Sequence, residues 1–238
     1  MDSTRKTAVV AGVVFIVATV APIVGSTFVP VLTGTDYLTR VAENANQVAV
    51  GTLLRLIGYL ACAGFAIALY PVLRKTNEGL ALGSVVFRAL ETLLYMAGPV
   101  SLLTLRTLGQ QFTTAGAADR ASLQAIGDSL VTVHQHAGLM AVFAFCVGVF
   151  MYYYLFYRSR LIPRWLSGFG IAAITLMGTA CVLSLFSGSP ITSYVGLAAP
   201  IALQEMVLAV WLIVKGFNSS AIPAESAKPA TKLELRAA

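Results

Sequence analysis

Charged residues are scarce in this chain of 238 residues. Asp, Glu, Lys and Arg together make up 11% of it, whereas soluble domains carry about 25%. The hydrophobic share is 58%, and several apolar runs reach the roughly 20 residues that a helix needs to cross a bilayer. This composition excludes an ordinary soluble domain. The sequence therefore predicts an all-α, polytopic membrane protein with the lipid bilayer as its solvent.

Histidine and cysteine are also rare, with two and three residues respectively. Cys62, Cys146 and Cys181 each lie alone inside an apolar run, which excludes a disulfide framework and a thiolate metal site and favours small buried hydrophobic side chains. His134 and His136 point about 160° apart on a helix, so they do not grip one metal together. No other span offers a histidine for a haem. We expect no metal and no cofactor.

The familiar catalytic motifs are absent from the sequence as well. It contains no nucleophile elbow, zinc-protease motif, phosphate loop or dinucleotide fingerprint. No residue is therefore assigned a catalytic role. The net charge of +6 does not indicate nucleic acid, because most basic residues lie in loops and tails on one side of the predicted membrane.

The apolar runs divide the chain into a transmembrane domain, residues 1–217, and a tail, residues 218–238, that is expected to be disordered and cytoplasmic. A bundle of six transmembrane helices accounts for the first part. Its spans are predicted near 7–29, 48–73, 80–107, 126–157, 166–188 and 194–217. Between them, 30–47 is a polar connection with either an interfacial helix or a helical extension, and 110–125 is a second long polar loop.

The distribution of Lys and Arg predicts the orientation. Only Arg40 and Arg120 lie in the loops of one side. The other side holds Arg5, Lys6, Arg74, Lys75, Arg158, Arg160, Arg164, Lys215, Lys228, Lys232 and Arg236. Because basic residues are retained in the cytoplasm, both termini are predicted to be cytoplasmic, and the expected location is the plasma membrane.

The third span is the most informative stretch because charged residues interrupt it. At 100° per residue, one face of about 60° carries Arg88, Glu91, Tyr95, Pro99, Leu102 and Arg106. A charge at the bilayer centre costs about 3 kcal/mol, so other helices must cover this face. Gly98 and Pro99 are expected to bend the span near its middle.

Charged side chains from three spans are predicted to meet at mid-depth. Arg55 lies in the second span, Arg88 and Glu91 in the third, and Glu205 in the sixth, while His136 lies nearer the outer side in the fourth. Intramembrane ionisable residues are candidates for a ligand-binding or proton-handling site. The equally open alternative is a buried ion-pair network that only fixes helix packing.

A larger set of residues resembles a family pattern. It comprises Arg55, Tyr70, Arg88-x-x-Glu91, His136-x-Gly138, Leu161-Ile162-Pro163-Arg164, Gly168, Gly170, Pro200, Glu205 and Trp211-Leu-Ile-Val-Lys215-Gly216. In order and spacing it is similar to an uncharacterised prokaryotic membrane-protein family, domain-of-unknown-function family 4386. The resemblance runs from about Thr7 to Gly216. It implies a multi-helix membrane protein with Arg55, Arg88, Glu91, His136 and Glu205 at pattern positions, and it implies no reaction, substrate or cofactor.

Three functions follow from these observations. The first is a transporter-like or ligand-binding protein with a site built from the five charged residues. The second is a structural or partner-binding protein. The third is a membrane-embedded enzyme acting on a lipid, with His136 and either Glu91 or Glu205 as acid and base.

Overall fold

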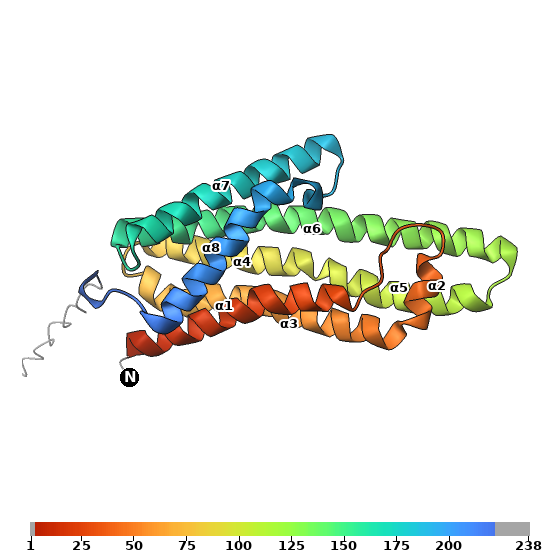
Figure 1. Cartoon of the computed structure of the whole chain (residues 1–238), viewed down its shortest axis with the longest axis horizontal. Coiled ribbons are helices and arrows are strands. Elements are labelled where there is room, and N and C mark those ends of the chain that lie inside the picture. The colour runs from red at the N-terminus through yellow and green to blue at the C-terminus, as the bar shows by residue number, and fades with distance from the viewer. Residues whose placement is uncertain (1–2, 222–238) are drawn as a thin grey trace, which may run out of the picture.

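The computed structural model describes residues 3–221, and the regular structure in that range is entirely helical (Figure 1). The helices are α1 (Ser3–Thr27), α2 (Tyr37–Glu43), α3 (Ala45–Leu73), α4 (Glu78–Tyr95), α5 (Ala97–Thr114), α6 (Ala117–Ser159), α7 (Arg164–Ser187) and α8 (Val195–Val214), with short 3-10 turns η1 (Ile191–Tyr194) and η2 (Ser219–Ala221). Most of the tail that was expected to be disordered, from 222 onward, lies outside the described residues.

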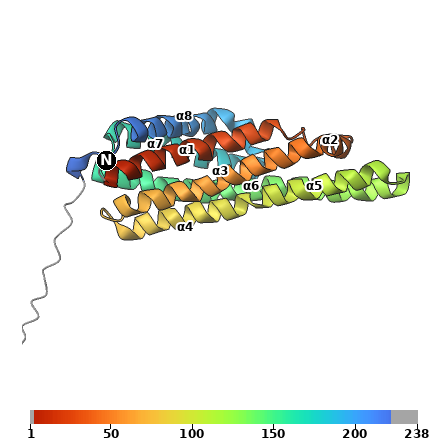
Figure 2. The same cartoon turned by 90° about the horizontal axis from the view of Figure 1, so that it is seen from below.

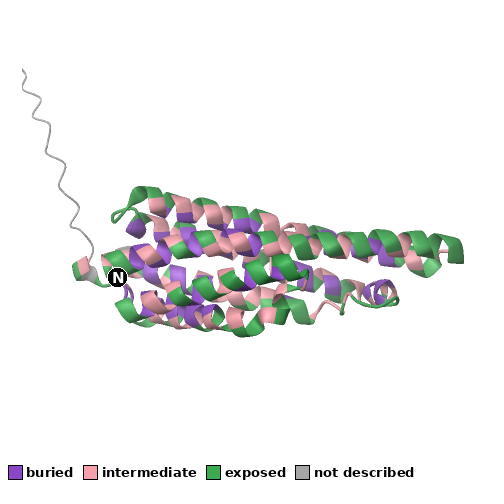
Figure 3. Ribbon diagram, turned by 90° about the horizontal axis from the view of Figure 1, so that it is seen from above, coloured by how far each residue is buried: buried purple, intermediate pink, exposed green. Residues whose placement is uncertain are grey.

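Six stretches of helix are long and apolar enough to cross a membrane. They are Thr4–Thr27, Ala45–Leu73, Glu78–Thr114, Ala117–Ser159, Arg164–Ser187 and Ile191–Val214. The all-α fold with six candidate spans that the sequence predicts is thereby confirmed. Exposed residues lie along the outside of this bundle (Figure 3). Many of them are large and apolar, with exposed fractions of 69% for Leu93 and 60% for Ile67. In a bilayer these side chains contact lipid rather than water.

The third span breaks where the sequence predicts a bend. Helix α4 ends at Tyr95, and α5 begins at Ala97. Pro99 has no backbone N–H, so it donates nothing to the carbonyl of Tyr95 one turn earlier. The backbone N–H of Met96 is shared between the carbonyls of Thr92 and Leu93, at 3.1 Å each.

Residues 110–125, which the sequence analysis assigned to a polar loop, are almost entirely helical. Helix α5 continues to Thr114 and α6 begins at Ala117, leaving a two-residue connection. With 43 residues, α6 is about 65 Å long, roughly twice the hydrocarbon thickness of a bilayer. Figures 1 and 2 show the ends of α5 and α6 projecting past α1, α7 and α8. A bilayer that covers the six candidate spans would leave this end outside its hydrocarbon layer. The expectation failed because apolar residues continue along both helices and bury one another there.

Helix α2 completes this extension, which we call the hairpin lobe (residues 37–43, 102–114 and 117–131). Leu38 and Val41 are fully buried against α5. The hydroxyl of Tyr37 donates to Oδ1 of Asp128 at 3.0 Å. Burial, and then the bond to the Asp128 carboxylate, raise the pKa of Tyr37 above its usual range. Helix α2 thus packs on protein, and the turn at Asn44 separates it from α3.

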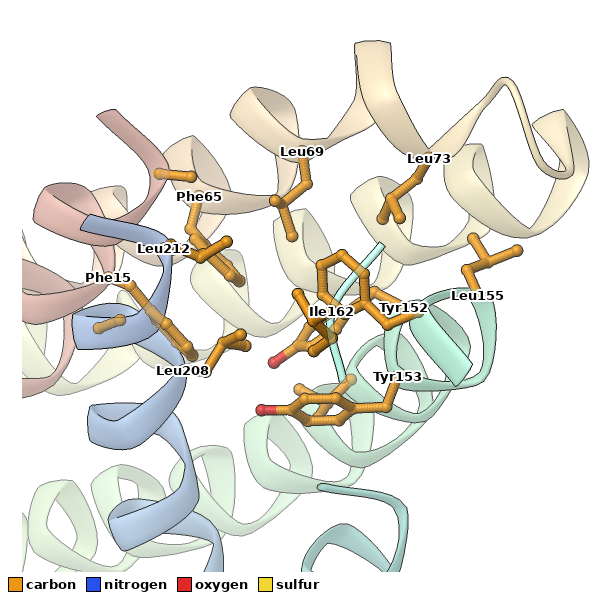
Figure 4. Packing of buried hydrophobic residues seen from close by; sticks show 14 of the residues in the cluster. Phe15, Phe65, Leu69, Leu73, Tyr152, Tyr153, Leu155, Ile162, Leu208 and Leu212 are labelled. Carbon is orange, nitrogen blue, oxygen red and sulfur yellow. The ribbon is translucent and has the colours of Figure 1, made fainter. Parts of the chain in front are cut away.

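The main core occupies the end of the bundle where the chain begins (Figure 4). Phe15 of α1 stacks on Phe65 of α3 with ring centroids 3.9 Å apart. Phe65 in turn meets the edge of Tyr152 of α6 at 5.7 Å. Tyr153 donates a hydrogen bond to the side-chain oxygen of Gln204 in α8. Aromatic packing therefore joins α1, α3 and α6, and the hydrogen bond to Gln204 adds α8, beside the charged residues.

Candidate functional site

Arg88 and Glu91 lie on the buried face of α4. Their exposed fractions are 1% and 2%, and Arg88 is about 15 Å along the helix from its start at Glu78. That places both near the middle of a hydrocarbon layer of about 30 Å. Nη1 of Arg88 is 2.9 Å from Oε2 of Glu91, an i, i+3 ion pair within one helix. The ring of Phe145 lies 5.0 Å from the guanidinium carbon, at cation–π distance.

Glu205 brings a second carboxyl group to Arg88 from another helix. It lies about 14 Å before the end of α8, so its depth matches that of Arg88. Its exposed fraction is 8%, and Thr19 of α1 contributes a hydrogen bond to its carboxyl group. Oε1 of Glu205 is buried and makes no hydrogen bond to any described residue. Two carboxyl groups therefore lie near one guanidinium, but only Glu91 forms an ion pair with it. Nε and Nη1 of Arg88 also make no hydrogen bond within the described residues.

These three residues line one end of a cavity of about 390 Å³, which we call the inner cavity. Tyr59 and Tyr95 contribute to the same polar end. Apart from Thr19, the remaining walls are apolar or carry a thiol, and they come from α1, α3, α6, α7 and α8. They include Phe15, Val142, Phe145, Met177, Ala198 and Ile201. The inner cavity therefore combines a charged end with an apolar body, as small-molecule sites commonly do.

The inner cavity opens between α1 and α8. These helices meet at the end that holds the N-terminus. There they pack so closely that a Cβ added to Gly12 would lie only 2.7 Å from the carbonyl oxygen of Ala209. Toward the other end they diverge (Figure 1). Ile23 of α1, with an exposed fraction of 61%, and the exposed Ala202 of α8 form the rim. The opening thus lies on the apolar outer surface of the bundle.

The structure brings together three of the five residues that the sequence analysis proposed for a site, namely Arg88, Glu91 and Glu205. Arg55 lies on α3 beside Tyr59, whose ring stacks on Tyr95 at 4.6 Å. Arg55 itself is not among the residues that line the inner cavity.

His136 is exposed and lines a different space, which we call the outer cavity. This cavity has a volume of about 460 Å³ and also contains His134. The two cavities share Tyr95 and Val142 as walls. No group of three or more metal-ligating side chains occurs within residues 3–221.

Some members of the site carry no clear signal in the sequence. Thr19 is one hydroxyl within an apolar run, and Phe145 is one aromatic residue among many. Their roles depend on which helices neighbour α4. The thiols of Cys146 and Cys181, which the sequence treats as isolated, lie against each other across α6 and α7.

Comparison with known proteins gives one finding. A family model described as "Domain of unknown function (DUF4386)" matches residues 10–216. The chain belongs to the DUF4386 family. The resemblance seen in the sequence is thereby confirmed, and the family match spans every residue that lines the inner cavity of this DUF4386 protein. No curated protein and no solved structure matches the chain.

Proposed function

We propose that this DUF4386 protein binds a small amphipathic cation inside the membrane, at the inner cavity, as part of small-molecule or proton-coupled transport. The observation that carries this proposal is the buried Oε1 of Glu205, which lines a cavity and has no hydrogen-bond partner within residues 3–221. A buried carboxylate oxygen without a partner costs free energy that a ligand with an N–H or O–H donor would recover.

The charges favour a cation. The single guanidinium of Arg88 already lies 2.9 Å from Glu91, so the carboxyl group of Glu205 is balanced by a proton or by a positively charged ligand. The aromatic rings of Phe15, Tyr59 and Tyr95 line the same cavity, and aromatic faces attract cationic groups by about 0.5–2 kcal/mol. The apolar walls add affinity for a hydrocarbon portion, and the opening between α1 and α8 suits a molecule that arrives from the lipid.

The two other functions are less well supported. The ion pair between Arg88 and Glu91 lies within α4, so this pair does not join one span to another, and Glu205 of α8 forms no ion pair with a described residue. The acid–base chemistry of a lipid-modifying enzyme needs His136 beside a carboxylate, and His136 faces the outer cavity.

A labelling experiment tests the proposal. The purified protein in lipid nanodiscs is treated with dicyclohexylcarbodiimide, an apolar reagent that modifies protonated carboxyl groups, and the labelled residues are mapped by mass spectrometry. We expect label at Glu205. Dimethyldecylammonium, a cation with one N–H donor, should slow this labelling several-fold, while neutral decanol and anionic decyl sulfate, which have the same hydrocarbon chain, should protect much less.

Variants provide the controls. Glu205→Gln should remove both the label and the thermal stabilisation by dimethyldecylammonium, whereas Glu43→Gln, a change at an exposed position of α2, should alter neither. Equal protection by all three decyl compounds, or ammonium stabilisation that survives in Glu205→Gln, would overturn the proposal.

We also propose a plasma-membrane location with both termini in the cytoplasm. The cluster of basic residues at the end that holds Arg74, Arg158 and Arg164 supports this orientation. The test is the accessibility of single cysteines to an impermeant maleimide in whole cells. A cysteine at Lys75 should be protected, and one at Arg120 should react; the opposite pattern would reverse the orientation.

A further inference from the structure

A third cavity, with a basic lining, lies at the end of the bundle where α8 ends. It has a volume of about 550 Å³ and lies between the α6–α7 turn and the end of α8. Three cationic side chains line it, those of Arg160, Arg164 and Lys215, and no acidic side chain among residues 3–221 does. We call it the basic cavity. Its lining concentrates positive charge at the level where the helices end.

The two walls of the basic cavity are tied to each other. The backbone N–H of Asn218, after α8, donates to the carbonyl of Leu161 in the α6–α7 turn at 2.8 Å. Gly216 adopts a φ of +74°, which lets the chain turn back over that site. Arg160 and Arg164 are thereby held opposite Lys215 by backbone structure.

Arg160 occupies an unusual backbone position. It follows the end of α6 with a φ of +58°, the only non-glycine residue with positive φ in the described range. Glycine adopts this left-handed conformation at lower cost than arginine. An arginine at this position is therefore better explained by its charge than by the turn. The N-terminus of α7, with Arg164 as its first residue, adds the positive end of a helix dipole.

An apolar groove adjoins the basic cavity. This groove, with a volume of about 420 Å³, shares Trp211 and Lys215 with the basic cavity and is otherwise lined by Met206, Val207, Val210 and Val214. From Met206 to Val214 it follows α8 for about 12 Å, close to the depth of one hydrocarbon leaflet, about 15 Å. Trp165 packs edge-on against Trp211 at 6.3 Å, and tryptophan pairs of this kind are typical of the membrane interface.

We propose that the basic cavity and the apolar groove together bind one anionic phospholipid. The phosphate group lies among Arg160, Arg164 and Lys215, and an acyl chain lies in the groove along α8. A free phosphate ion satisfies the first half of this site and leaves the groove unused. The continuity of the two through Trp211 and Lys215 favours a lipid. This site lies apart from the inner cavity, so it does not depend on the function proposed there.

The test measures lipid retention and lipid-dependent stability. The purified protein is titrated in detergent with phosphatidylglycerol or phosphatidylcholine of matched acyl chains, and bound lipid is counted by native mass spectrometry. We expect one phosphatidylglycerol to be retained in preference to phosphatidylcholine. The variants Arg160→Gly and Lys215→Gln should each weaken phosphatidylglycerol binding about fivefold, the effect of removing one basic residue near anionic lipid.

Arg160→Gly separates binding from folding, because glycine suits the left-handed position and the variant should unfold at or above the wild-type temperature. Lys75→Gln is the matched control, an exposed cation at the same end of the bundle but outside the cavity. Equal binding of the two lipids, or a loss in Lys75→Gln as large as in Arg160→Gly, would overturn the proposal. Stabilisation by inorganic phosphate alone to the same extent as by phosphatidylglycerol would assign the site to a soluble anion and overturn the lipid.

Discussion

The most direct prediction concerns an asymmetry between Glu91 and Glu205. Both carboxyl groups are buried in the inner cavity near one guanidinium, but only Glu91 forms an ion pair with Arg88, at 2.9 Å. Glu91→Gln removes the ion-pair partner of Arg88, whose exposed fraction is only 1%. Breaking a buried pair in this way costs about 3–5 kcal/mol. For a chain of this size each kcal/mol lowers the melting temperature by about 2–4 °C, so Glu91→Gln should melt about 6–20 °C below wild type.

Glu205→Gln should behave differently. Oε1 of Glu205 has no hydrogen bond to lose within the described part of the chain, and glutamine has nearly the same shape. We expect a change within about 1 kcal/mol, or about 4 °C in either direction. The assay is thermal unfolding in one detergent at one scan rate, because membrane proteins commonly unfold irreversibly and the apparent midpoint then depends on rate.

A double variant refines the measurement. Arg88→Met alone should lower the melting temperature about as much as Glu91→Gln does. Arg88→Met combined with Glu91→Leu should restore most of the lost stability, because an apolar pair replaces a buried ion pair at little cost. The reasoning is refuted if Glu205→Gln melts as low as Glu91→Gln. In that case Glu205 is a necessary partner of Arg88, and the carboxylates serve packing.

Three further predictions test the helix packing around the site. In the hairpin lobe, Gly127→Ala places a Cβ inside the contact distance of the Tyr37 hydroxyl, so amide hydrogen exchange of α2 should accelerate. The control Gly178→Ala, at a glycine whose added Cβ would meet no atom within 4 Å, should have no such effect. Mild oxidation should join the tryptic peptides that contain Cys146 and Cys181, and a Cys146→Ser control should not give this product; failure of wild type to cross-link would contradict the packing of α6 on α7. Arg5→Gln removes hydrogen bonds from the guanidinium to the last carbonyls of α8, including that of Leu212 at 2.9 Å. This variant should lower the free energy of unfolding by about 1.5–3 kcal/mol, measured by thermal unfolding. An unchanged melting temperature would show that this cap contributes nothing.

The residues that define the membrane fold are readable in the sequence. Apolar runs of about 20 residues predict spanning helices because a bilayer offers no hydrogen-bond partner for an unpaired backbone. Arg88 and Glu91 predict a covered face on the third span for the same electrostatic reason. Pro99 predicts the break between α4 and α5, since the missing N–H is a local property of one residue.

The hairpin lobe shows where this reasoning fails. Residues 110–125 have a polar composition that resembles a loop, yet Phe112 of α5 and Leu123 of α6 pack against a buried cluster that includes residues of α2. Their helical state depends on contacts between segments far apart in the chain, such as the bond from Tyr37 to Asp128, which are 91 residues apart. Hydropathy along a single segment contains no information about such partners.

The sequence by itself determined that this protein is helical, that it is suited to a membrane, and that charges are buried within it, because length, apolarity and the cost of desolvation act on each segment alone. Only the tertiary structure decided that Glu205 joins Arg88 and Glu91 while His136 faces another cavity. Helical periodicity fixes which side chains share a face of one helix, but not which helix lies opposite. That choice follows from packing, such as the contact of Gly12 with Ala209, which no single segment specifies.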